Sequence, residues 1–170
     1  AEFYRHMVDV CLKNKIELTV AVAPVHALQL EAMHHAGVWD CFEHMKRELV
    51  AVTAEEQAAH PDAPKVALWD FSGYRGPMAE NVPPEGDMTP MRWYWEASHF
   101  TTALGKAVVE RTMGLPLPEG IDAADFGVRI SPDNIEPHLA DIRRQRAGYQ
   151  AAHAENVGFV DGLAAKLLGN

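Results

Sequence analysis

The chain has 170 residues, of which 48% are hydrophobic, so it holds enough apolar material for a domain with its own core, and a wholly disordered chain is excluded. Its 15 basic and 24 acidic residues give a formal charge of −9, which repels phosphate backbones and argues against a nucleic-acid partner. No uninterrupted apolar run approaches the roughly 18 residues that a membrane-spanning helix needs.

Residues 2–14 begin the chain with an amphipathic pattern, in which Phe3, Met7 and Val10 recur at helical spacing. The chain starts at Ala1 without an initiator methionine, and we therefore expect it to be a fragment or a processed piece of a longer protein. The apolar, β-branched run 16–24 follows and ends at a proline. Such a run is typical of a strand that is covered on both faces, as in a parallel sheet.

Two helices are expected over residues 27–36 and 38–59, and a second strand-like run covers residues 65–72. The order helix, strand, helices, strand is that of α/β domains. The two cysteines, Cys11 and Cys41, fall in separate predicted helices without the Cys-x-x-Cys spacing of a thiolate metal site. We expect them to be buried thiols; the alternative is a disulfide between them.

Polar residues at the end of the second predicted strand are candidate binding residues. Ligands of parallel sheets bind outside the carboxyl ends of the strands, where Asp70 and Ser72 are expected to lie. We predict that both residues contact substrate; the alternative is that they serve in a turn and a helix cap. Residues 74–92 are rich in Gly and Pro and predict a long loop, either over a functional cleft or wrapped on the surface.

The stretch over residues 93–99 combines aromatic side chains with an acid and a base. His99 follows Glu96 by three residues, a spacing that lets the carboxylate orient an imidazole whose unperturbed pKa is about 6.5. The pair therefore predicts a catalytic base, His99, with Glu96 as its orienting acid. Trp93 and Trp95 precede the pair and are candidate stacking surfaces for sugar rings, unless they pack in the core.

The same Glu-x-x-His spacing occurs in carboxylate-bridged metal sites, so the histidines need a second interpretation. Such sites need the motif twice together with further carboxylates, and the adjacent His34 and His35 point in different directions on a helix. We therefore predict no metal and no cofactor.

The last third of the chain is expected to be mostly helical. A short helix is predicted up to Gly114, and an extended segment follows over residues 126–130. Ser131 and Pro132 are the residue types of a helix cap and of a first helical position, which predicts a helix from there. We expect the apolar tail 157–168 to continue this helix and to pack on a second copy of the chain, as a homodimer.

The residues around the acid–base pair also resemble a known family. Residues 94–100, Tyr-Trp-Glu-Ala-Ser-His-Phe, with Leu-Gly at 104–105, resemble the last sequence block of SGNH-type hydrolases and of their O-acetylation relatives in bacterial exopolysaccharide pathways. That block has Asp-x-x-His, a hydrophobic residue and a downstream Gly, and Glu96 stands in the place of its Asp. The preceding helix, the Lys-Asn-Lys-Ile turn, the apolar strand and Pro24 are similar to the segment that precedes the block in that family.

The resemblance implies an α/β fold in which three α/β/α layers, arranged as in flavodoxin, surround a mostly parallel sheet that is incomplete in this chain. Residues 1–130 are then the C-terminal part of an SGNH-like domain, and residues 131–170 are a C-terminal helical extension. The N-terminal half of the domain is expected to lie outside this chain. The implied location is periplasmic, or membrane-associated on the extracytoplasmic side.

The implied function is a carbohydrate-directed ester hydrolase or O-acetyltransferase, with a carbohydrate or an acyl ester as its substrate. In that family the histidine activates a serine, and this role falls on His99 here. The family's serine lies in a Gly-Asp-Ser block that this chain lacks, since its three serines are Ser72, Ser98 and Ser131. The alternative is a catalytically inactive SGNH-like protein that binds saccharides or acts as a scaffold.

Overall fold

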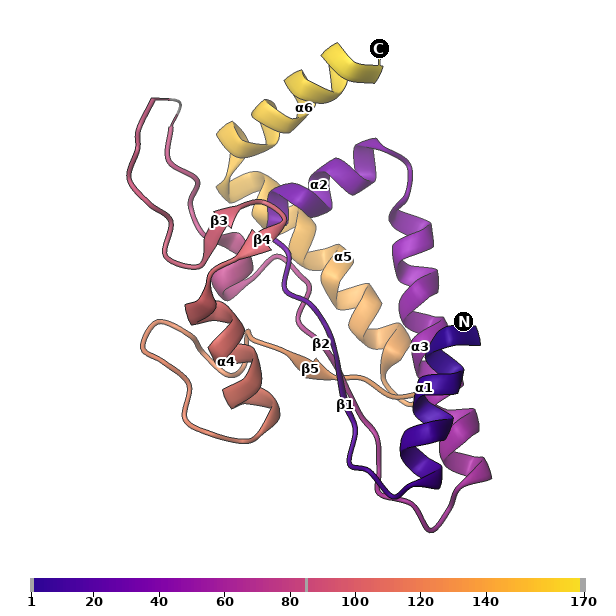
Figure 1. Cartoon of the computed structure of the whole chain (residues 1–170). Coiled ribbons are helices and arrows are strands. Elements are labelled where there is room, and N and C mark those ends of the chain that lie inside the picture. The colour runs from indigo at the N-terminus through magenta and orange to yellow at the C-terminus, as the bar shows by residue number, and fades with distance from the viewer. Residues whose placement is uncertain (1, 85, 169–170) are drawn as a thin grey trace.

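The computed structural model of the protein describes residues 2–84 and 86–168 (Figure 1). Its α-helices are α1 (Glu2–Lys13), α2 (Ala27–His35), α3 (Trp39–Ala59), α4 (Thr102–Thr112), α5 (Ile135–Ala152) and α6 (Ala154–Leu168). Its strands are β1 (Thr19–Val22), β2 (Ala67–Asp70), β3 (Tyr94–Glu96), β4 (His99–Phe100) and β5 (Val128–Arg129), with a short 3₁₀ helix, η1, at Gly76–Ala79. No helix in this described part is long and apolar enough to cross a membrane.

The main sheet has three short strands in the order β1-β2-β5. β1 and β2 run parallel, with Thr19 opposite Ala67, whereas β5 runs antiparallel to β2, with Arg129 opposite Trp69. Helices make up 54% of the structure and strands 9%, and the sheets have two or three strands. The expected three-layer α/β/α fold with a mostly parallel sheet is therefore wrong.

The physical reason lies in the coverage of β1. The run 16–24 contributes four residues to a strand, and these alternate between exposed and half-buried positions. Leu18 and Val20 pack against Val8 and Leu12 of α1, but Thr19 is exposed. A continuous apolar run thus became a strand with one covered face, which is the pattern of a sheet margin rather than of a central strand.

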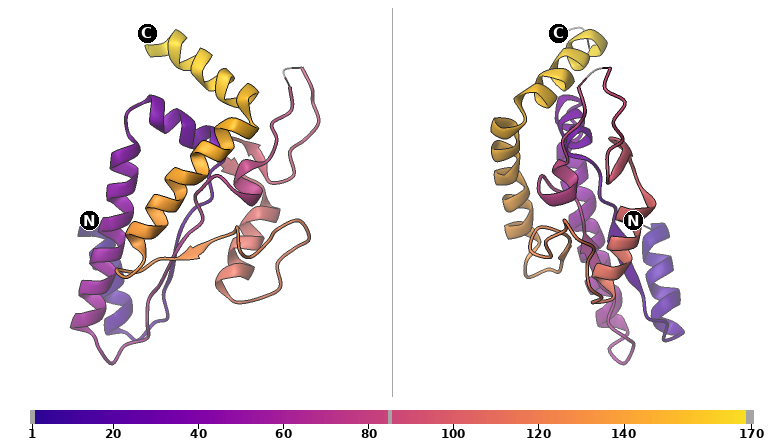
Figure 2. Two further views of the ribbon diagram at one scale, coloured as in Figure 1. Left: turned by 180° about the vertical axis from the view of Figure 1, so that it is seen from behind. Right: turned by 90° about the vertical axis from the view of Figure 1, so that its left-hand side faces the viewer.

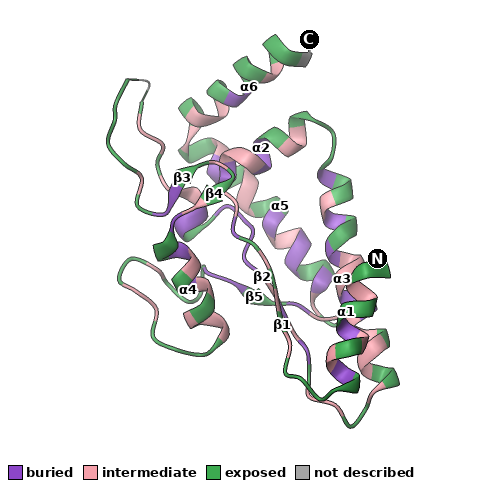
Figure 3. Cartoon of the chain, in the orientation of Figure 1, coloured by how far each residue is buried: buried purple, intermediate pink, exposed green. Residues whose placement is uncertain are grey.

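Two long helices make apolar contact with β2. Leu68 and Ile130 pack with Val50 of α3 and with Ile135 and Leu139 of α5. Viewed from behind, α5 runs obliquely beside α3 (Figure 2), and both helices carry buried positions along their length (Figure 3). This packing turns one face of β2, the face of Leu68, toward α3 and α5.

A second core cluster joins the loop after β2 to α4. Phe71 and Phe126 contact each other there, with ring centroids 4.9 Å apart, and the cluster also contains Leu104 of α4 and Trp93. The cluster holds α4 and the segment that leads into β3 against the carboxyl end of β2. It therefore positions the predicted acid–base pair.

Several sequence predictions need correction in their boundaries. The last long helix begins at Ile135 rather than Ser131, because the side chain of Asn134 accepts the N–H of Ser131 (2.8 Å) and closes a turn there. Helix α5 ends at Ala152, and after His153 the apolar tail forms a separate helix, α6. Both cysteines are free, but Cys11 is only half-buried and Cys41 is exposed, so the prediction of two buried thiols is wrong.

The C-terminal helix packs on α2 through one face. Val160 is buried, and His35 of α2 pairs with Asp161 at 2.8 Å. Phe159 and Leu167 are exposed on α6, and the homodimer through this helix stays a prediction.

Candidate functional site

The predicted acid–base pair lies on a two-stranded hairpin. β3 pairs antiparallel with β4, and Glu96 stands opposite His99 across a two-residue turn. The hairpin is closed at its base, where the N–H of Thr101 donates to the carbonyl of Trp93 at 2.8 Å. Thr101 is also the N-cap of α4. The residue that closes the base of the hairpin therefore joins the hairpin to the start of this helix.

The carboxylate of Glu96 is bonded directly to Nδ1 of the His99 imidazole. The same carboxylate accepts the backbone N–H of Ser98 at 2.8 Å and the Ser98 hydroxyl at 2.9 Å. Because a carboxylate is an acceptor, Nδ1 carries the proton in this bond, and Nε2 is left as the basic nitrogen of the neutral ring. The pair therefore has the tautomer that a general base requires.

Electrostatics keep the acid of this pair ionised. The backbone N–H of Ser98, together with the His99 ring and the Ser98 hydroxyl, lowers the pKa of Glu96 to about 2. The His99 side chain is 79% exposed and that of Glu96 is 54% exposed. The pair thus stands on the surface of this chain, open to a substrate or to a covering segment.

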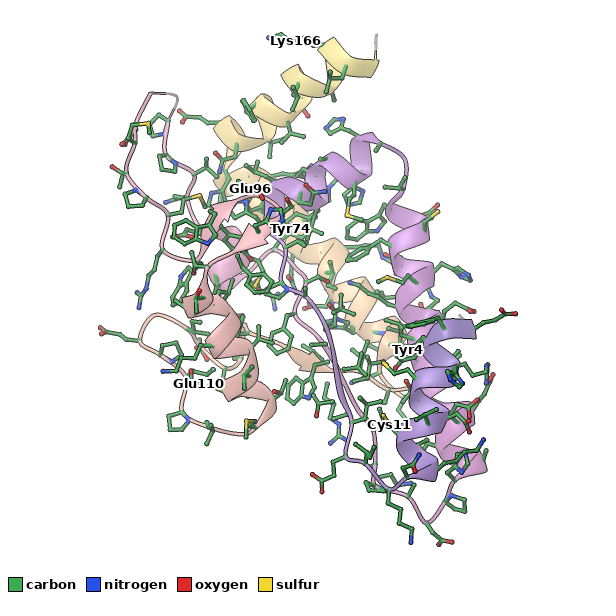
Figure 4. The ribbon with its side chains drawn as sticks, viewed as in Figure 1. Tyr4, Cys11, Tyr74, Glu96, Glu110 and Lys166 are labelled. Carbon is green, nitrogen blue, oxygen red and sulfur yellow. The ribbon has the colours of Figure 1, made fainter. Side chains whose placement is uncertain are left out.

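The hairpin is tied to the start of α2, directly after β1. The backbone N–H of His26 donates to the carbonyl of Ala97, in the hairpin turn, at 3.1 Å. The buried His26 ring accepts the N–H of Leu28 at Nδ1 (3.2 Å) and lies 2.8 Å from the Glu80 carbonyl through Nε2. Burial lowers the pKa of His26, so the ring is neutral and serves as the helix cap. Figure 1 shows β3 and β4 beside this end of α2, and Figure 4 labels Glu96 there.

The two candidate stacking tryptophans differ in exposure, although residues two apart in a regular strand share a face. Trp93 precedes β3, and the register of the hairpin shifts between Tyr94 and Glu96. Trp93 is buried in the core cluster, with the guanidinium of Arg92 4.4 Å from its ring centroid. Trp95 is 72% exposed on the same hairpin as the acid–base pair. Trp95 therefore lies at the surface, next to Glu96 in the sequence, whereas Trp93 is part of the core.

Asp70 and Ser72 lie together in a different place, inside the protein. Oδ2 of Asp70 is 2.8 Å from Nζ of Lys46 in α3 and 2.8 Å from Nε2 of His138 in α5. The Ser72 hydroxyl donates to Oδ1 of Asp70 at 2.7 Å and accepts from Lys46 at 2.6 Å. Lys46 is fully buried and Asp70 is 1% exposed. We call these four residues, Lys46, Asp70, Ser72 and His138, the buried ionic cluster.

The buried ionic cluster is satisfied internally. Burial raises the pKa of Asp70, but the charge of Lys46 and the bond from His138 outweigh it and bring the value to about 2. Both hydrogen-bonding functions of the Ser72 hydroxyl are engaged, so this serine is held as a structural element rather than offered as a nucleophile. The sequence analysis missed Lys46 and His138. The available signal was a lysine in the apolar face of a helix, one turn after Phe42 and one turn before Val50.

One group of metal-type ligands is close enough to share an ion, among the residues that the structure describes. It consists of Asp9, Glu56 and His60, whose ligand atoms lie within 4.8 Å of one another. Lys13 contacts Asp9 at 2.7 Å and Arg5 contacts Glu56 at 2.6 Å. Cationic side chains thus already neutralise both carboxylates, and we assign no metal to the group.

Comparison of the chain with protein-family models, with curated proteins and with solved structures finds no match. The function is therefore inferred from the residues and their geometry.

Proposed function

We propose that Glu96 and His99 are the acid–base part of an ester hydrolase or O-acyltransferase that acts on acylated carbohydrate. The observation that carries the proposal is the bond from the Glu96 carboxylate to Nδ1 of His99, with Nε2 on the exposed side of the hairpin. An imidazole held in this tautomer by a carboxylate is the arrangement that activates a hydroxyl nucleophile at neutral pH.

The chemistry assigned to the pair has two proton transfers. Nε2 accepts the proton of a hydroxyl as its oxygen attacks the ester carbonyl, and the imidazolium then returns this proton to the departing alkoxide. Glu96 stays ionised because its pKa is about 2, and it stabilises the imidazolium between the two steps.

The nucleophile in this proposal comes from a segment outside the 170 residues. Ser72 belongs to the buried ionic cluster, Ser98 donates to Glu96, and Ser131 lies in the turn before α5. A segment that covers the hairpin and carries a serine fits the high exposure of His99. The missing N-terminal half and the extracytoplasmic location stay predictions.

The test is the hydrolysis of p-nitrophenyl acetate and of an O-acetylated oligosaccharide by the protein expressed from its complete reading frame. We expect His99→Ala to lower kcat/KM by about 10²–10⁴-fold, since general-base catalysis contributes that much. His44→Ala is the matched control, because His44 is an exposed histidine on α3, and we expect it to leave turnover unchanged. Turnover that survives His99→Ala, or an equal loss in the control, would remove the proposal.

A second candidate function, saccharide binding without catalysis, is favoured by the exposed Trp95. Flat aromatic faces stack on the apolar faces of sugars. If this function holds, we expect acetylated oligosaccharide to change the tryptophan fluorescence of the protein, and Trp95→Ala to weaken binding about tenfold while His99→Ala leaves it unchanged. Fluorescence that does not respond to the saccharide, in the unaltered protein, would contradict it.

A further inference from the structure

A cavity of about 370 Å³ lies away from the hairpin, where the second half of α3 faces the amino end of β2 and the turn after β5. Its walls are largely apolar and come from all three segments: Val50, Ala54, Val66, Leu68, Ile130 and Pro132. The volume is within the range of small-ligand sites, and at about 30 Å³ per water-sized group it holds roughly a dozen heavy atoms.

The neutral polar side chains in the cavity wall are used inside the protein. The Thr53 hydroxyl donates to the carbonyl of Leu49 at 2.7 Å. The Gln57 side chain accepts the N–H of Val66 at 3.0 Å and donates to the carbonyl of His60 at 3.3 Å. The Ser131 hydroxyl donates to Oδ1 of Asn134 at 3.4 Å. The charged groups of the wall are two cations, Lys65 and Arg129.

Eleven of the fifteen Lys and Arg side chains of this chain have a partner among the described residues, and Lys65 and Arg129 are two of the four that have none. Nine of its Lys and Arg side chains form ion pairs, and Arg92 and Arg111 donate to backbone carbonyls. Lys65 and Arg129 are exposed, and neither side chain has an ion-pair or hydrogen-bond partner in residues 2–84 and 86–168. The chain has a net charge of −9, but the rim of this apolar cavity carries two positive charges without a partner, which attract an anion.

We propose that this cavity binds a small anionic amphiphile, namely a medium-chain carboxylate of about eight carbons. The aliphatic body fills the apolar walls, and the carboxylate is held by Arg129 and Lys65 at the rim. Arg is suited to this role because its planar guanidinium matches the two oxygens of a carboxylate. The site is separate from the acid–base pair, since none of the residues that line the cavity belongs to the β3–β4 hairpin.

The test is an NMR titration of the 170-residue chain with octanoate, followed through the methyl signals of Val50, Leu68 and Ile130. We expect saturable shifts of these signals with a Kd of roughly 1 mM or tighter, from the affinity that about ten ligand atoms supply. Acetate lacks the aliphatic body, octylamine reverses the charge, and both should fail to shift the signals in this range. Absence of saturable shifts with octanoate, or equal binding of octylamine, would overturn the proposal.

Charge-reversal variants add a second readout. Lys65→Glu and Arg129→Glu should each weaken octanoate binding by about tenfold or more, because each removes a charged hydrogen-bond donor. Lys15→Glu and Lys166→Glu are the matched controls, since these exposed cations also lack a partner among the described residues and lie elsewhere, Lys166 on α6 (Figure 4). Ala54→Trp should abolish binding by filling the cavity. Equal weakening by the control variants would show general charge attraction and reject the site.

Discussion

Replacing Asp70 by asparagine is expected to lower the free energy of unfolding by about 3–5 kcal/mol, the cost of breaking a buried ion pair by removing one partner. The substitution leaves the ammonium of Lys46 without its counter-charge, and this side chain is fully buried in α3. Asparagine still accepts a hydrogen bond, but it does not balance the charge. Urea unfolding followed by tryptophan fluorescence measures the loss.

A surface pair provides the control for this prediction. Glu136→Gln removes a carboxylate bonded to Arg47 at 2.5 Å, but the Glu136 side chain is 59% exposed, so we expect a much smaller loss than for Asp70→Asn. In the double variant Lys46→Met, Asp70→Asn, the loss should be smaller than the sum of the single losses, because no buried charge is then left alone. A loss below 1 kcal/mol for Asp70→Asn would contradict the assignment of an ionised pair.

Replacing Gly127 by alanine is expected to lower the free energy of unfolding by about 2–5 kcal/mol. Gly127 has φ +76°, a left-handed conformation that costs an L-residue roughly 1–2 kcal/mol. A Cβ there would also lie 2.4 Å from Cε1 of Phe71, and overpacking of a core adds about 1–3 kcal/mol. Phe71 is fully buried and directly follows Asp70, so its displacement also disturbs the carboxyl end of β2.

The control for Gly127 separates the backbone from the packing contribution. Gly114 has φ +69°, and a Cβ built there meets no atom within 4 Å. Gly114→Ala should therefore cost about 1–2 kcal/mol, the conformational part alone. Thermal unfolding of the two variants under one condition compares them. Equal losses would mean that Phe71 moves aside without cost.

Local patterns proved reliable in this chain because their partners are close in sequence. Helical periodicity predicted helices over 2–14, 27–36 and 38–59, and the structure has α1, α2 and α3 there. The spacing of Glu96 and His99 predicted that the carboxylate meets the imidazole, and a two-residue turn brings them together. Neither inference needed knowledge of distant segments.

The sequence by itself therefore determined most helices, the parallel pair β1–β2 and the contact between Glu96 and His99, since periodicity and short spacing act within a few residues. Tertiary structure alone decided the size of the sheet and the antiparallel direction of β5. It also decided that Asp70 is buried, because its partner His138 is 68 residues away in the sequence. Whether a polar residue at a strand end faces a ligand or a buried lysine depends on which helix packs over it. Here α3 and α5 close over Asp70, and the hairpin that carries His99 stays open to solvent.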